Sequence, residues 1–128
     1  MTRNTVETSA APVPRAGYSQ AARAGDVLHV SGTLGLDPQT GMIVQGAVEE
    51  ELHQVFRNIR SVLEAAGSSL DDVVKTTVFV TDFSFYASFD AIYRTYFSAP
   101  FPARSTVQVA GLLAGASIEV EAIAVTTA

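Results

Sequence analysis

The middle of the chain carries a long stripe of apolar residues with the spacing of one helix face. Between residues 48 and 66 they recur at steps of three and four, with charged residues on the opposite side. Gly67 follows directly, as a C-cap glycine does. The pattern predicts an amphipathic helix that buries one face. The stripe consists of Val48, Leu52, Val55, Phe56, Ile59, Val62, Leu63 and Ala66.

Runs of β-branched and apolar residues elsewhere predict strands, the first two joined by a tight turn at residues 24–26. A second helix follows Asp82 or Ser84, either of which is a good N-cap. It carries an aromatic stripe and cannot continue through Pro100. The predicted strands are 19–23, 27–31, 73–81, 104–109 and 117–125, with a short addition at 42–44.

The order of these elements predicts an α+β fold with one mixed sheet. Right-handed crossovers place both helices on the same face of that sheet. The last strand nevertheless has apolar residues on both sides, with Ile118 and Val120 on one and Ile123 and Val125 on the other. Two helices on one face leave the other uncovered, so we predict a homo-oligomer built on the sheet.

The length of 128 residues corresponds to about one domain. Residues 1–15 are small, polar and proline-bearing, which predicts a flexible lead-in, and residues 16–128 are predicted to form a single domain. No segment approaches the ~18 continuous apolar residues of a membrane span, and the first 25 residues lack the apolar core of a signal peptide. We therefore expect a soluble, cytoplasmic protein with no membrane partner.

Composition excludes several classes of protein. With no cysteine, the chain has no disulfide, thiolate nucleophile or iron–sulfur cluster. His29 and His53 stand alone, so we expect no metal site. The net charge is −5, and 8 basic residues, of which only Lys75 is a lysine, do not form the positive stripe that nucleic-acid binding requires. We therefore expect no nucleic-acid partner.

A few side chains are suited to chemistry. Arg104 opens a predicted strand after two prolines and suits bidentate capture of a carboxylate, although arginines at strand ends more often pair with a neighbouring acid or with water. Glu119 and Glu121 point to one side of the last strand, where either could activate a water or simply be solvated. Tyr18 and Ser31 flank the first hairpin as hydroxyl donors or as ordinary edge residues.

Several segments, in order from about residue 17 to residue 125, together resemble the RidA/YjgF family of enamine/imine deaminases. Each segment is short, and the resemblance is carried by their conjunction over nearly the whole chain. They are Tyr18-Ser19-Gln20-Ala21, Val30-Ser31-Gly32, Leu36-Asp37-Pro38, Thr40-Gly41, Asn58-Ile59, Leu63-Glu64-Ala65-Ala66-Gly67, residues 72–80, Pro102-Ala103-Arg104-Ser105-Thr106-Val107 and residues 118–124.

The resemblance implies a chorismate-mutase-like α+β fold and a homotrimer with three sites in the clefts between protomers. It also implies hydrolysis of reactive 2-enamino or 2-imino acids to 2-oxo acids and ammonium, without a cofactor. Arg104 and Glu119 match the catalytic positions, where they would grip the substrate carboxylate and position the attacking water. Tyr18, Ser31 and the backbone around Thr106 match positions that contact the substrate.

The chain departs from the family pattern in several places, including three single positions. Gly17 precedes the tyrosine where a proline is usual, Asp90 stands where asparagine is common, and Gly111 lies where the family usually carries an arginine. These departures leave substrate preference open. They also leave open a non-catalytic trimer that binds small carboxylates or a protein partner. A ribonuclease, the activity by which the family has also been labelled, is disfavoured by the net charge.

Overall fold

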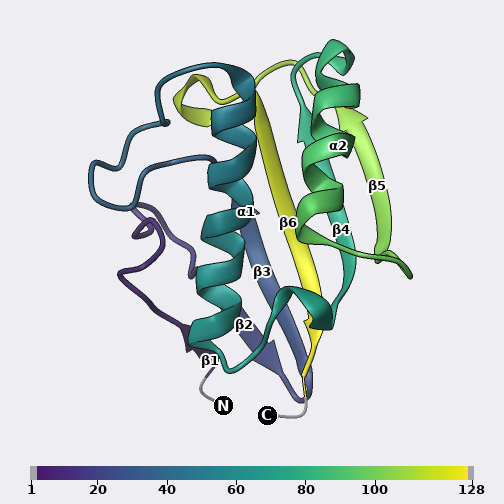
Figure 1. The fold of residues 1–128 in the computed structure, drawn as a ribbon. Coiled ribbons are helices and arrows are strands. Elements are labelled where there is room, and N and C mark those ends of the chain that lie inside the picture. The colour runs from purple at the N-terminus through teal and green to yellow at the C-terminus, as the bar shows by residue number, and fades with distance from the viewer. Residues whose placement is uncertain (1–2, 127–128) are drawn as a thin grey trace.

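Two helices lie across one face of a six-stranded sheet, and the other face carries none (Figure 1). The computed structural model describes residues 3–126. The strand order is β1-β2-β3-β6-β4-β5, and all neighbours are antiparallel except β4 and β5. This mixed sheet confirms the predicted α+β fold. The strands are β1 (Asn4–Val6), β2 (Ala21–Ala24), β3 (Val27–Thr33), β4 (Val73–Val80), β5 (Ala103–Gln108) and β6 (Ile118–Val125); the helices are α1 (Val48–Ala65) and α2 (Tyr86–Tyr96), with short 3₁₀ turns η1 (Leu70–Asp72), η2 (Phe83–Phe85) and η3 (Leu113–Gly115).

Helix α1 packs its apolar stripe on the centre of the sheet, as its sequence predicts. The chain turns sharply at its end because Gly67 adopts a positive φ of 76°. The Gly67 N–H donates to the Glu64 carbonyl and the Ser68 N–H to the Leu63 carbonyl, so the last carbonyls of the helix are satisfied. The fully buried stripe residues are Leu52, Val55, Phe56, Ile59 and Leu63.

Helix α2 covers β4 and β5 with the predicted aromatic stripe, in which Phe89, Tyr93 and Phe97 are buried. Phe56 of α1 lies against this cluster, with its ring centroid 5.7 Å from that of Tyr93. The predicted cap is displaced by one turn, because Asp82 accepts a hydrogen bond from the Ser84 N–H at the start of η2 rather than at α2 itself.

The prediction of a flexible lead-in over residues 1–15 is wrong for the part that the structure describes. Residues 4–6 form β1, which pairs with β2 at the sheet edge, and Ala11 is buried in the core. Gln20 holds the intervening segment, because its side chain accepts from the Thr8 N–H and donates to the Thr8 and Pro12 carbonyls. The small polar residues of this segment give no sign of its order, since the groups that hold it lie on β2 and at Gln20, just before that strand. The short strand predicted at 42–44 is reduced to one bridge between Leu36 and Ile43.

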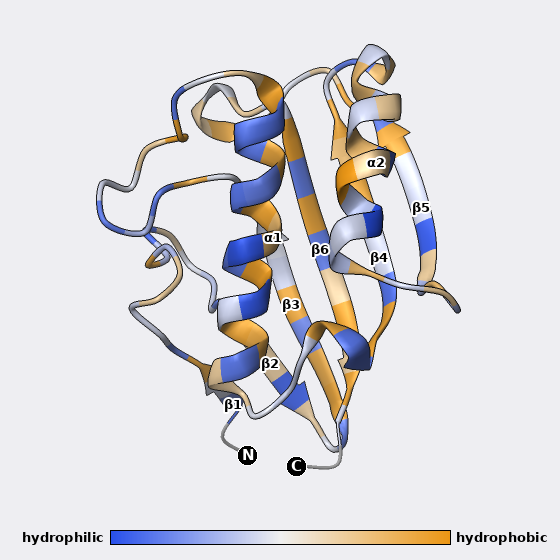
Figure 2. Ribbon diagram, viewed as in Figure 1, coloured by the Kyte–Doolittle hydropathy of each residue, from blue (hydrophilic) through white to orange (hydrophobic). Residues whose placement is uncertain are grey.

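The helix-free face of the sheet mixes apolar and polar side chains. Alternation along β6 sends Val120 and Ala122 toward the helices and Glu121 and Ile123 the other way, and Figure 2 shows the resulting alternation of hydropathy along this strand. Val125, on the same side as Ile123, is 44% exposed. The uncovered face is therefore partly apolar, and it also carries the carboxylates singled out from the sequence.

Candidate active site

Three of the predicted site residues converge beside a bulge in β3. The pairing of β3 with β6 shifts register between Val30 and Thr33, and at this bulge Gly32 lies directly against the Glu119 side chain. The Ser31 hydroxyl donates to the Ser19 carbonyl at 2.6 Å, and this bond ties the segment that carries Tyr18 to β3. A groove of about 440 Å³ runs between them, lined by Tyr18, Ser31, Gly32, Glu119 and Glu121 among others.

Glu119 is the carboxylate best suited to proton transfer. Its side chain is partly buried, and burial, followed by the negative charge of Glu121, raises the pKa of Glu119 above its ordinary value. Gly32 faces it so closely that a Cβ there would lie 2.6 Å from Glu119 Oε2. The absence of a side chain at position 32 therefore defines where this carboxylate sits. A carboxylate raised in pKa is a stronger base toward a water held nearby.

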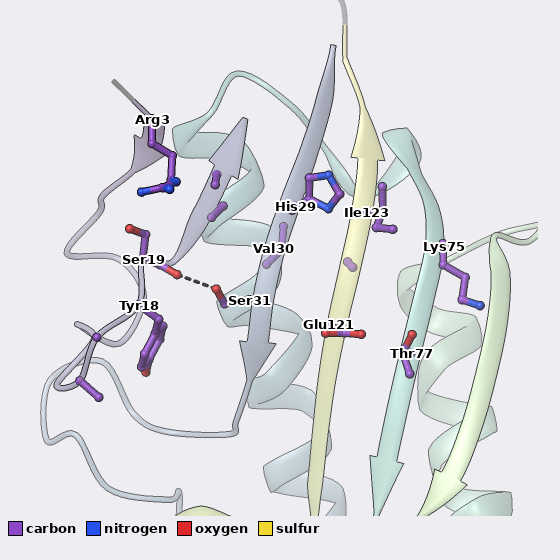
Figure 3. Close-up of a pocket in the computed structure, with 15 residues that line it drawn as sticks. Arg3, Tyr18, Ser19, His29, Val30, Ser31, Lys75, Thr77, Glu121 and Ile123 are labelled. Carbon is purple, nitrogen blue, oxygen red and sulfur yellow. Dashed lines mark hydrogen bonds between the residues drawn. The ribbon is translucent and has the colours of Figure 1, made fainter. Parts of the chain in front are cut away.

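The groove continues onto the helix-free face as a larger depression of about 780 Å³, shown in Figure 3. Tyr18 and Ser31 lie on its border, and Glu121 projects from β6 into its middle. Its other polar lining residues are Arg3, Ser19, His29, Lys75 and Thr77, none of which the sequence analysis named as a catalytic or substrate-binding residue. For His29, Lys75 and Thr77 the only sequence signal was their alternate positions along β3 and β4, because no local motif encodes the strand order that aligns them.

Arg104 lies in a different environment, under α2. Its Nη1 donates to Asp90 Oδ1 at 3.0 Å and its Nη2 to the Tyr86 hydroxyl at 2.6 Å. The guanidinium carbon also lies 4.7 Å from the centroid of the Tyr93 ring, a cation–π distance. The side chain is 18% exposed and borders a pocket of about 300 Å³ together with Asp90, Arg94 and Phe101. The arginine is thus both paired with an acid and available to a ligand.

Arg104 and Glu119 lie on opposite faces of the sheet within one chain. Arg104 pairs with Thr76 of β4, which is buried beneath the helices, whereas Glu119 pairs with Phe79, three residues further along β4. An odd separation along a strand reverses the face. Thr106 lies two residues after Arg104 on β5. The structure therefore gathers Tyr18, Ser31 and Glu119 in one place, and Arg104 and Thr106 in another.

No three His, Asp or Glu side chains within residues 3–126 gather closely enough to hold a metal ion. Over the same residues, no helix is long and apolar enough to cross a membrane.

The fold and the site together define a class of small α+β domains. In this class, a groove that contains carboxylates lies at the bulge of β3, on the sheet face without helices. Comparison with known proteins identifies the family within this class. The sequence profile of the endoribonuclease L-PSP family matches residues 8–126, and the chain belongs to this family, which is the RidA/YjgF family. The rat protein named 2-iminobutanoate/2-iminopropanoate deaminase is 44% identical over 123 residues, covering 96% of this chain and 90% of that protein.

Solved structures of relatives have the same fold. A crystal structure of a putative endoribonuclease from Thermotoga maritima is 44% identical, covers 99% of this chain and 100% of that one, and has a TM-score of 0.94. The structure of TdcF from E. coli with bound serine is 35% identical, covers 97% of this chain and 99% of that one, and has a TM-score of 0.92.

Proposed function

We propose that this protein is a deaminase that hydrolyses reactive 2-enamino and 2-imino acids to 2-oxo acids and ammonium. The observation that carries the proposal is the partly buried Glu119 carboxylate, raised in pKa, in a groove with Tyr18 and Ser31. The curated relatives support the same activity, since those at 41–44% identity include several named 2-iminobutanoate/2-iminopropanoate deaminase.

Each step of the reaction has a residue suited to it. Arg104 binds the substrate carboxylate, a charge-assisted contact worth about 1.5–3 kcal/mol. Glu119 accepts a proton from water as the oxygen attacks the imine carbon, which gives a carbinolamine. The imine nitrogen takes up this proton as the carbinolamine forms; the carbinolamine hydroxyl proton then passes to the nitrogen as the carbon–nitrogen bond breaks, so that a carbonyl and ammonia result. Positioning of this kind needs no cofactor, because the imine carbon is already electrophilic. The relative with bound serine supports binding of a small amino-acid-like molecule by this fold.

A second copy of the chain completes the site in this proposal. Arg104 and Thr106 lie on β5, the last strand in the sheet order, whose outer backbone edge pairs with no other strand among the described residues. Glu119 opens onto the helix-free face, which retains exposed apolar area at Val125. Both features are suited to contact with a neighbouring protomer. We therefore propose a homotrimer in which the arginine edge of one copy meets the Glu119 groove of the next.

The test is a coupled assay. A serine or threonine dehydratase releases the imine, semicarbazide competes for it, and formation of the 2-oxo acid is followed with and without the protein. We expect the wild type to accelerate release and Arg104→Ala to lose about 10- to 100-fold in kcat/KM, since the carboxylate contact is gone. A wild type that leaves imine hydrolysis unchanged, while binding 2-oxobutanoate in calorimetry, would replace this proposal with the non-catalytic carboxylate-binding trimer.

The matching family and the Thermotoga relative both carry the name endoribonuclease, so RNA cleavage is the second candidate. The net charge of −5 opposes it, because RNA affinity depends on neutralising phosphates. The same preparation is incubated with labelled single-stranded RNA at low and physiological salt. We expect neither binding nor cleavage; cleavage lost in Glu119→Gln would favour the ribonuclease.

A further inference from the structure

Asp90 of α2 joins two arginines that come from different elements. Its Oδ2 accepts from Arg94 Nε one turn along the helix, and its Oδ1 accepts from Arg104 Nη1 on β5, both at 3.0 Å. The hydrogen bond from Arg94, followed by that from Arg104 and the charges of both, holds the pKa of Asp90 below its ordinary value. Asp90 is therefore ionised at neutral pH.

The ion pair limits what Arg104 offers to a ligand. A guanidinium has five N–H donors, of which Asp90 and the Tyr86 hydroxyl each take one. The Tyr93 ring covers one of its faces at 4.7 Å. The remaining donors suffice for one bidentate carboxylate. Asp90 therefore fixes both the orientation of Arg104 and the number of anions that it can accept.

The charge balance of the pocket beside Arg104 also limits the site to one bound carboxylate. Within one chain, two guanidinium groups and one carboxylate line it, which leaves a single positive charge, and the described residues of the Glu119 groove of the next copy in the proposed trimer add no cation to it. A bound monocarboxylate neutralises that charge. The second carboxylate of a dicarboxylate ligand would meet a neutral cluster that contains the Asp90 carboxylate, which is partly desolvated, with its side chain 28% exposed. The aromatic walls from Tyr93 and Phe101 weaken solvent screening of this repulsion.

We propose that Asp90 is a positioning residue that makes this a one-carboxylate site, selecting imines of monocarboxylic amino acids against imines of glutamate or aspartate. The inference rests on the proposed deaminase function and names its substrate class. An asparagine at position 90 keeps an oxygen that accepts from Arg104 but removes the charge. The selection against dicarboxylates therefore depends on the charge of Asp90 in this chain and not on the shape of the fold.

The experiment compares Asp90→Asn with Asp26→Asn. Asp26 lies exposed in the β2–β3 turn, near the opposite end of the strand order from β5, and its replacement makes the same change in net charge. An amino-acid oxidase generates the imine of 2-aminobutanoate or of glutamate, and kcat and KM are measured for each. We expect Asp90→Asn to raise the ratio of kcat/KM for the glutamate imine to kcat/KM for the 2-aminobutanoate imine about tenfold, because KM for the glutamate imine falls. Asp26→Asn is expected to leave this ratio unchanged.

A binding measurement separates this inference from the proposed function. Calorimetry with 2-oxobutanoate and 2-oxoglutarate needs no turnover, and the affinity ratio is expected to move in the same direction in Asp90→Asn. If the ratio moves but no variant hydrolyses an imine, the deaminase function fails and the role of Asp90 survives. If imines are hydrolysed but neither ratio moves in a folded Asp90→Asn protein, the inference is wrong. Asp90→Glu, which keeps the charge, is expected to retain the wild-type preference.

Discussion

Gly32 offers the sharpest test of whether the position of the Glu119 carboxylate governs activity. A Cβ at position 32 would lie 2.6 Å from Glu119 Oε2 and 2.9 Å from its Cδ, whereas ordinary contacts begin at 3.4 Å. In Gly32→Ala the carboxylate must therefore move by roughly 1 Å. A displacement of that size at a reacting group costs up to about 100-fold in rate. The clash involves the far end of a flexible side chain that can turn aside, so we expect stability to fall by only about 0.5–1.5 kcal/mol.

The assay is kcat/KM in the coupled imine reaction, with urea denaturation as the check on folding. Gly111→Ala is the matched control, because a Cβ there meets nothing within 4 Å. The double variant Gly32→Ala/Glu119→Gln tests the cause: if the alanine acts by displacing Glu119, it has no further effect once that carboxylate is an amide. Full activity in Gly32→Ala, or an undiminished effect in the double variant, would refute the reasoning.

Three further predictions follow from the contacts described. Because burial, followed by the charge of Glu121, raises the pKa of Glu119, the acidic limb of kcat/KM against pH lies above that of an ordinary glutamate. Glu121→Gln removes the second cause and is expected to move the limb to lower pH. The raised pKa also means that folding favours protonated Glu119, so stability is lost as pH rises through that pKa; Glu119→Gln should therefore raise Tm at pH 7 more than at pH 4. Glu51 is 6% exposed and accepts from the Ser117 and Ile118 N–H groups, so Glu51→Ala should lower the unfolding free energy by about 2–4 kcal/mol in urea titrations, and Glu51→Gln by less.

Each of these three predictions has its own control or contradicting result. Glu64→Gln, on the exposed side of α1, removes one charge without touching the groove and should leave the pH profile in place. A Tm difference for Glu119→Gln that is equal at both pH values would contradict the linkage argument. A Glu51→Ala protein as stable as the wild type would mean that the two backbone donors find other partners.

Local patterns in the sequence were sufficient for both helices and for β2 to β6, but not for β1. The three-and-four spacing from Val48 to Ala66 predicted α1 because a helix repeats its face about every turn. Gly67 ended the helix because a residue without Cβ adopts the positive φ there without steric cost. Alternation in residues 117–125 likewise predicted a strand with two different faces. The family resemblance then supplied candidate residues from motifs spread over the whole chain.

Only the tertiary structure decided which of those candidates meet. Arg104 and Glu119 are separated by the sheet itself, and their opposite faces depend on the register of β5 and β6 against β4, which no local pattern encodes. The pairing of Arg104 with Asp90 depends on how α2 crosses β5. The order in residues 4–11 depends on β2 and Gln20. Periodicity is a short-range property of the chain and determines elements, whereas register and packing join residues far apart in sequence and determine the site.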